Sequence, residues 1–176
     1  MCIRDSPGIE SEERGLASEI AASLARMSSL RTPIVSAVIG EGGSGGALAL
    51  AVADRVLMLE GAIYSVIAPE GAATILYHDV ERAAEVSAKL KLTAQELRAL
   101  GIVDEIIPEP RAAEPELIAE TLAAAITDSL ARLQRKKVQR VVSDRYDRYR
   151  RVGRPYAQAP RRLRIPSRRG QDSRAG

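Results

Sequence analysis

Apolar residues recur at helical spacing near the start of the chain. Between residues 12 and 30 they share one side of a helical wheel, at Leu16, Ile20, Leu24 and Met27. This spacing predicts an amphipathic helix that ends before Pro33, because the residue preceding a proline is pushed out of helical geometry. Residues 33–39 then form a β-branched apolar run of strand length. Its lack of polar alternation predicts a strand buried on both faces, as in a parallel sheet.

The pattern changes at a glycine-rich segment, residues 40–46, which is expected to form a loop. The apolar run that follows, residues 47–53, predicts a short buried helix. Residues 55–59 and 62–67 have the composition of two further strands, and a helix is expected to begin near Gly71.

The second half of the chain continues the alternation. Residues 80–100 are typical of a helical region, with Thr93 and Glu96 spaced as a capping box and Gly101 as the helix stop. Residues 102–107 predict a strand. A last long helix carries an apolar stripe at Leu117, Leu122, Ile126, Leu130 and Leu133. Strands that alternate with helices indicate an α/β fold.

Composition excludes several classes of protein. Apolar residues make up 45% of the 176 positions, which is enough for a real core, but aromatic residues make up only 3%, so stacking platforms for nucleic-acid bases are nearly absent. The single cysteine, Cys2, excludes a disulfide framework and a cysteine-rich zinc site, and no metal is expected on this chain. The chain has no apolar run of membrane-spanning length and no signal-peptide pattern, so we expect a cytoplasmic protein without a membrane partner.

The net charge of +3 conceals two oppositely charged parts. Residues 1–131 hold 10 Lys and Arg against 20 Asp and Glu, whereas residues 132–176 hold 16 against 3. The basic part is rich in Arg, Pro and Gly beyond Arg150, and residues 154–176 are predicted to be a disordered tail. A nucleic-acid-binding protein acting through this tail is one alternative function.

Two patterns with side-chain chemistry fit the glycine-rich segment. Gly40, Gly42 and Gly45 match the dinucleotide-binding fingerprint G-x-G-x-x-G, and Glu60 could hold a ribose hydroxyl, so a dinucleotide-binding module is a second alternative. Ser44 lies within G-x-S-x-G, the nucleophile elbow of hydrolases. The one histidine, His78, follows too soon after Ser44 for the chain order of that class.

A third interpretation uses only the backbone. Glycines at a strand-to-helix turn expose N–H groups, and the helix N-terminus adds a partial positive charge. Such a turn can form an oxyanion hole that stabilises a developing negative charge without any ionisable residue.

Several segments of the sequence carry a family resemblance. Residues 32–50 (TPIVSAVIGEGGSGGALAL) and 64–71 (YSVIAPEG) resemble the carboxyltransferase alpha subunit of bacterial acetyl-CoA carboxylase. Residues 7–15 (PGIESEERG), the stretch from Leu92 to Pro110, and residues 144–153 (DRYDRYRRVG) are similar to further segments of that family. The resemblance covers residues 7–153; residues 1–6 are expected to be a leader outside the family, and residues 7–153 one carboxyltransferase domain.

The resemblance implies a crotonase-like spiral fold and a biotin-dependent carboxyltransferase, an enzyme of fatty acid biosynthesis. Carboxybiotin, carried on a separate biotin carboxyl carrier protein, would donate its carboxyl group to acetyl-CoA and give malonyl-CoA. The backbone N–H groups of Gly45 and Gly46 would form the oxyanion hole at the biotin ureido oxygen, and Gly42 and Gly43 would shape the carboxybiotin site.

The same resemblance implies a hetero-oligomer with a carboxyltransferase beta subunit that binds acetyl-CoA, and residues 145–151 are a candidate surface for docking it. No nucleic-acid partner is implied. Because the family is longer on the N-terminal side, we expect an N-terminally truncated fragment that is inactive alone.

Overall fold

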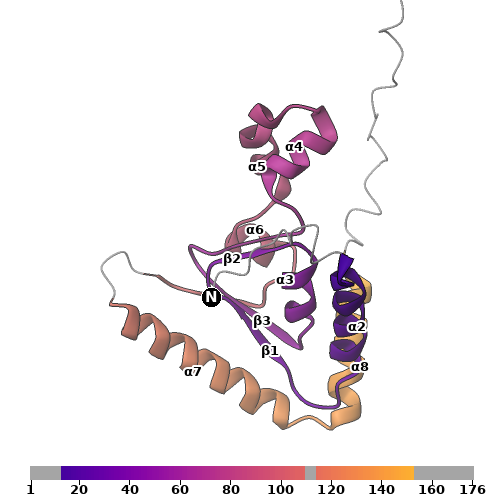
Figure 1. Ribbon diagram of the computed structural model, residues 1–176. Helices are drawn as coiled ribbons and strands as arrows, with labels where there is room; N and C mark the ends of the chain where they lie inside the picture. Colours follow the sequence, from indigo (N-terminus) through magenta and orange to yellow (C-terminus); the bar gives the residue numbers. More distant parts are fainter. Residues whose placement is uncertain (1–12, 110–113, 153–176) are drawn as a thin grey trace, which may run out of the picture.

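The computed structural model describes residues 13–109 and 114–152 (Figure 1). The leader expected at residues 1–6 and the tail expected at 154–176 lie outside the described residues, as does most of the 7–15 segment. Within the described part, strands and helices alternate along the chain, and the strands that pair are all parallel. The α/β prediction is therefore confirmed.

A three-stranded parallel sheet forms the centre of the molecule. Its strands are β1 (Val35–Val38), β3 (Arg55–Leu59) and β5 (Glu105–Ile107), in the order β1-β3-β5. Val56, Leu57 and Met58 on the central strand are at most 2% exposed, because neighbours cover both faces of β3. The parallel pairing predicted from the apolar run of residues 33–39 is therefore confirmed. The burial expected on both faces of that run was wrong, because β1 is an edge strand and is only half-buried along its length.

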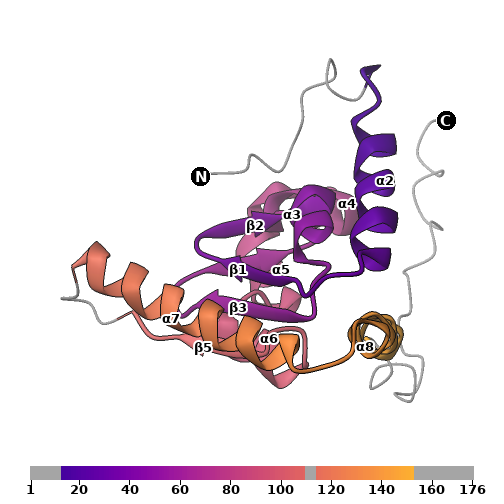
Figure 2. The same ribbon diagram turned by 90° about the horizontal axis from the view of Figure 1, so that it is seen from below.

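Helix α7 (Pro115–Gln134) lies along this sheet (Figure 2). The side chains that it packs against the buried core come from one stripe of the helix: Ile118, Leu122, Ala125 and Ile126. The expected long helix is therefore confirmed, with Pro115 at a position where its missing N–H removes no hydrogen bond. It is not the last helix as expected, since residues 138–151 form another, and Leu117 of the expected stripe is 55% exposed.

A second, two-stranded sheet joins β2 (Glu41–Gly43) to β4 (Ile63–Ser65). Helix α3 (Ser44–Ala51) follows β2 directly and contacts helix α2 (Leu16–Ser29). At the other end of the chain, α8 (Val138–Arg151) also packs against α2.

Helices α4 (Pro69–Tyr77) and α5 (Ala83–Leu90), with the short 3-10 helix η1 (Val80–Arg82) between them, form a lobe that projects from the sheets (Figure 1). This lobe has a small buried core of its own, at Ala72, Ala73 and Val86. Helix α6 (Ala94–Ala99) then returns the chain to β5. In the part of the chain that the structure describes, no helix is both long and apolar enough to cross a membrane.

The helical region expected at residues 80–100 is in fact broken. Lys91 has φ 58° and ends α5, and the carbonyl of Leu92 accepts a hydrogen bond from Tyr64 N–H. The hydrogen bond between Tyr64 and Leu92, which are distant in sequence, thus falls within the stretch whose local pattern predicts a continuous helix. The capping box is confirmed, since the Thr93 hydroxyl accepts from Glu96 N–H while Glu96 accepts from Thr93 N–H, and Gly101 (φ 72°) follows the helix end as expected.

Candidate functional site

The glycine-rich segment begins as a strand, not as a loop. Residues Glu41–Gly43 pair with Ile63–Ser65 in parallel register, and the helix starts at Ser44. The expectation of a loop over residues 40–46 and a helix from residue 47 was therefore wrong at both boundaries. The strand arises from a partner 22 positions along the chain, Gly42 facing Tyr64, which the local sequence does not reveal.

The turn between β2 and α3 depends on a serine. Gly43 is extended (φ −134°, ψ 158°), whereas Ser44 has φ 60°, in the left-handed region that an L-residue adopts at a cost of about 1–2 kcal/mol. The sharp change of direction from strand to helix is thus made at the one non-glycine residue among residues 42–46.

The N-terminus of α3 has no side chain that accepts a hydrogen bond from its first N–H groups or balances the helix dipole. It has no side-chain cap and no acidic residue in its first turn. The first N–H groups of a helix have no intrahelical acceptor, and the helix dipole places a partial positive charge there. The N–H groups of Gly45 and Gly46 therefore lie at an end of the helix that can receive a negatively charged or strongly polarised oxygen.

The glycines of this segment have different neighbours. A Cβ on Gly42 would lie 3.1 Å from Cδ2 of Tyr64, and one on Gly45 would lie 3.3 Å from Cγ2 of Ile20 on α2. A Cβ on Gly46 would meet nothing within 4 Å. Gly42 and Gly45 thus allow close packing within the chain, while Gly46 borders open space.

A pocket of about 460 Å³ lies beside this segment. Strand β1, the glycine segment and helix α3 all contribute to its lining, together with Tyr64 on β4. Burial raises the pKa of Tyr64 to about 12, and the nearby Tyr149 contributes to the rise. The phenol therefore stays neutral at physiological pH, and the pocket is mainly apolar. Gly43, Gly45 and Gly46 are not among its lining residues, so the pocket lies next to the start of α3 and does not include it.

The side chains invoked by the alternative interpretations do not gather at this turn. Glu60 follows the last residue of β3, and its carboxylate accepts a hydrogen bond from the backbone N–H of Glu109 at 3.5 Å. His78 is exposed and ends α4 in a left-handed conformation, with its N–H donating to Thr74 O. Among the residues that the structure describes, no three His, Cys, Asp or Glu side chains are placed to hold a metal ion.

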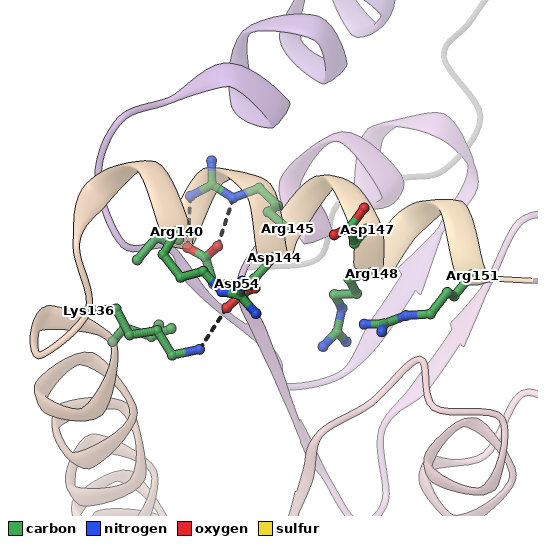
Figure 3. A pocket seen from close by; sticks show the side chains of 10 residues that line it. Asp54, Lys136, Arg140, Asp144, Arg145, Asp147, Arg148 and Arg151 are labelled. Carbon is green, nitrogen blue, oxygen red and sulfur yellow. Dashed lines mark hydrogen bonds and ion pairs between the residues drawn. The ribbon is translucent and has the colours of Figure 1, made fainter.

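Sequence reasoning missed the residues that hold the other end of α3. The Tyr149 hydroxyl on α8 donates to Ala51 O at 2.6 Å and accepts from Ala53 N–H at 2.9 Å. Its neighbour Arg145 is 1% exposed and forms an ion pair with Asp54 just beyond α3 (Figure 3). The available signal was the spacing of Arg145, Arg148 and Tyr149, which places all three on one face of a helix.

The expected docking surface at residues 145–151 therefore needs correction. Arg145 is fully buried, Arg148 donates to Asp104 and to Ile102 O, and Tyr149 bonds to the end of α3. Each of these three side chains forms hydrogen bonds within the chain, so they stabilise the fold and do not form a docking surface. Tyr146 and Arg150, with the Arg150 guanidinium 5.4 Å from the Tyr146 ring centre, remain on the surface.

The sequence is similar to known proteins over most of its length. Residues 5–153 match the family model described as acetyl co-enzyme A carboxylase carboxyltransferase-like. The chain is 43% identical over 160 residues to the acetyl-coenzyme A carboxylase carboxyl transferase subunit alpha of Clostridium botulinum, covering 87% of this chain and 58% of that protein. It is 50% identical over 145 residues to the subunit of the same name from Streptococcus thermophilus, covering 82% and 56%. The chain thus spans about half the length of the curated relatives that it matches.

Solved structures agree on the fold. A Pseudomonas malonate decarboxylase hetero-tetramer in complex with malonate superposes with a TM-score of 0.62 at 19% identity, over 85% of this chain and 62% of that one. The transcarboxylase 12S structure superposes with a TM-score of 0.52 at 27% identity, over 69% and 25%. An enoyl-CoA hydratase/isomerase from Marinobacter aquaeolei also superposes, with a TM-score of 0.50, which confirms the crotonase-like fold. The family match over residues 5–153 and the identities of 43% and 50% to the two alpha subunits show that the chain belongs to the acetyl-CoA carboxylase carboxyltransferase alpha-subunit family.

Proposed function

We propose that this chain supplies the carboxybiotin site of a carboxyltransferase that moves a carboxyl group to acetyl-CoA and forms malonyl-CoA. The observation that carries the proposal is the start of α3, which has neither a side-chain cap nor an acidic residue in its first turn and borders open space at Gly46. A helix end without a side-chain cap or an acidic residue in its first turn suits an oxygen that gains negative charge during a reaction.

The residues of the site fit the polar head of biotin. Carboxybiotin supplies an activated carboxyl group on a ureido nitrogen. The N–H groups of Gly45 and Gly46 donate to the ureido oxygen, while Gly42 and Gly43 keep the approach to the turn narrow and free of side chains. A donor of this kind typically contributes about 3 kcal/mol to the transition state, because it is already oriented before charge develops.

The proposal includes partner proteins. The curated relatives are named as alpha subunits, and the malonate decarboxylase relative is a hetero-tetramer. On the projecting lobe and the strand end before it, Val66, Ile75 and Leu76 are 74%, 67% and 62% exposed, an apolar surface of the kind that partners cover. We infer a hetero-oligomer in the cytoplasm, with a beta subunit that binds acetyl-CoA and a carrier protein that delivers carboxybiotin, and with residues 7–153 as one domain.

The test is the reverse reaction, malonyl-CoA-dependent carboxylation of free biotin, by the chain paired with a bacterial carboxyltransferase beta subunit. Turnover is expected for the pair and not for the chain alone. Gly46→Val should reduce kcat about 100-fold or more, since a side chain would occupy the open space in front of the N–H groups. Thr127→Val, which places the same β-branched side chain at an exposed position of α7, is the control and should leave kcat unchanged. Full turnover by Gly46→Val would refute the oxyanion assignment.

A further inference from the structure

A second cavity, of about 400 Å³, lies against α8 (Figure 3). It shares no lining residue with the pocket beside the glycine segment. Five of its ten lining residues are Lys or Arg and three are Asp, so its walls are strongly charged and carry an excess of positive charge.

The deep part of this cavity is electrically neutral. Arg145 and Asp54 pair there at 2.7 Å with side-chain exposures of 0% and 4%. Arg148 is paired at 2.8 Å with Asp104, whose other carboxylate oxygen accepts from Val56 N–H. These pairs belong to the packing of α8 against the sheet, and the excess charge must lie nearer the mouth.

At the mouth, three cations surround one carboxylate. Lys136 Nζ lies 2.9 Å from Oδ2 of Asp144, and Arg140 Nε lies 2.8 Å from Oδ1. The hydrogen bond from Lys136, together with the charges of Lys136, Arg140 and Arg151, holds the pKa of Asp144 below its ordinary value. A single negative charge thus faces three positive ones.

Arg151 and Arg148 extend to the same side of α8, where their guanidinium groups point toward one another (Figure 3). Like charges one helical turn apart repel each other. The Asp147 carboxylate points away from this side (Figure 3), and its charge instead acts on Arg150. Because Arg148 is balanced by Asp104, the excess positive charge on this side of α8 comes from Arg151.

The direction of α8 adds to the positive potential. Its first turn holds no acidic residue and its N-cap residue, Lys137, makes no side-chain cap. Lys136 and Arg140 therefore lie at the positive end of the helix dipole, where a basic residue is unfavourable unless an anion is near.

We propose that this cavity binds the phosphate group of a small phosphorylated ligand, held by Lys136, Arg140 and Arg151 at the mouth, with Arg148 behind them. Guanidinium groups donate paired hydrogen bonds to phosphate oxygens, and a phosphate dianion matches the two positive charges that Asp144 leaves uncompensated. The concave shape and volume fit a small molecule better than a strand of nucleic acid, which needs an extended basic track.

The experiment is a phosphate titration of the full 176-residue chain at constant ionic strength, followed by calorimetry and by the side-chain NMR signals of the arginine Nε–H groups. Inorganic phosphate should bind and shift the signals of Arg140, Arg148 and Arg151. Arg151→Gln and Lys136→Gln should each weaken binding about tenfold, the loss of one charge-assisted contact. Asp144→Asn should tighten binding about tenfold, because it removes the carboxylate that competes with the ligand.

Arg132→Gln is the matched control. Arg132 forms an exposed ion pair with Asp128 at 2.7 Å on α7 and does not line the cavity. Unchanged affinity in Arg151→Gln, an equal loss in Arg132→Gln, or weaker binding in Asp144→Asn would each overturn the proposal.

Titrations with further ligands distinguish a nucleotide, free phosphate and a macromolecule as the natural ligand. Adenosine 3′,5′-bisphosphate binding more tightly than inorganic phosphate would indicate a nucleotide ligand, and equal binding would indicate phosphate itself. If a single-stranded oligonucleotide or a polyglutamate peptide binds at this face while inorganic phosphate does not, the surface serves a macromolecule and the proposal fails. None of these readouts depends on carboxyltransferase activity.

Discussion

Arg145 and Asp54, 91 positions apart, form a buried two-pronged ion pair, with Nε–Oδ1 at 3.0 Å and Nη2–Oδ2 at 2.7 Å. The remaining guanidinium donors reach the carbonyl oxygens of Met27, Leu30 and Thr32, so all five N–H groups are used. Asp54 also accepts from Ile34 N–H at 2.8 Å. One guanidinium therefore joins α8 to the end of α2, the start of β1 and the turn before β3.

Arg145→Lys should destabilise the protein by about 3–5 kcal/mol, because a lysine cannot satisfy the carboxylate and three carbonyl groups together. The free energy of unfolding from denaturant titration measures this loss. Arg132→Lys, which changes an exposed ion pair, should cost less than about 1 kcal/mol. Similar losses for the two substitutions would show that the Arg145 network is not formed in solution.

Tyr149→Phe should cost about 1–3 kcal/mol, since Ala53 N–H loses its acceptor in a partly buried position and Ala51 O loses its donor. Tyr146→Phe is the control, because that ring is 58% exposed and its hydroxyl only accepts from Arg150. Hydrogen exchange should locate the added fraying of the Tyr149 variant at the end of α3. Unchanged protection at Ala53 would contradict the assignment.

Gly45→Ala and Gly46→Ala should affect the paired enzyme through different causes. The Gly45 variant should lower the free energy of unfolding, because its Cβ meets Ile20, and Ile20→Ala should restore part of the loss in the double variant. The Gly46 variant has room for its Cβ and should reduce kcat with little change in stability. A double-mutant cycle without coupling between positions 20 and 45 would rule out the packing role.

Ser44→Gly should raise the free energy of unfolding, measured by denaturant titration, by about 1 kcal/mol, since glycine adopts the φ of 60° at this position without a steric penalty.

Ser44→Ala keeps the backbone penalty and removes the hydroxyl. It should retain substantial carboxyltransferase activity with the beta subunit, because the proposed site uses backbone groups. Loss of four orders of magnitude in kcat with the fold intact would instead indicate a serine nucleophile.

The raised pKa of Tyr64, about 12, predicts a change in stability at high pH. The folded state binds the phenolic proton more tightly than the unfolded state, whose tyrosines titrate near 10. The stabilisation is therefore complete below about pH 10 and is lost as the pH rises from 10 to 12. Unfolding free energies of the wild type, relative to Tyr64→Phe, should fall over this interval. A constant difference would mean that the phenol is not desolvated.

Local sequence determined those features of the chain that neighbours along the backbone control. The apolar run of residues 33–39 predicted a strand of a parallel sheet and that of residues 55–59 a further strand, and β1 and β3 are paired in parallel. Thr93 and Glu96 predicted a capping box because their mutual hydrogen bonds need only three residues of separation. The family resemblance, carried by contiguous segments, likewise identified the fold and the glycine segment without any knowledge of distant contacts.

Tertiary structure decided the features that depend on residues far apart in the chain. Strand β2 exists because Gly42 lies beside Tyr64, and α3 can begin as early as Ser44 because that pairing fixes the turn. Arg145 lies in a strongly basic segment that local composition assigns to the surface, yet it is buried because Asp54 and three carbonyl groups meet it there. Parallel pairing and buried charge both require partners brought together by the whole fold, so neither is contained in the local pattern of residues.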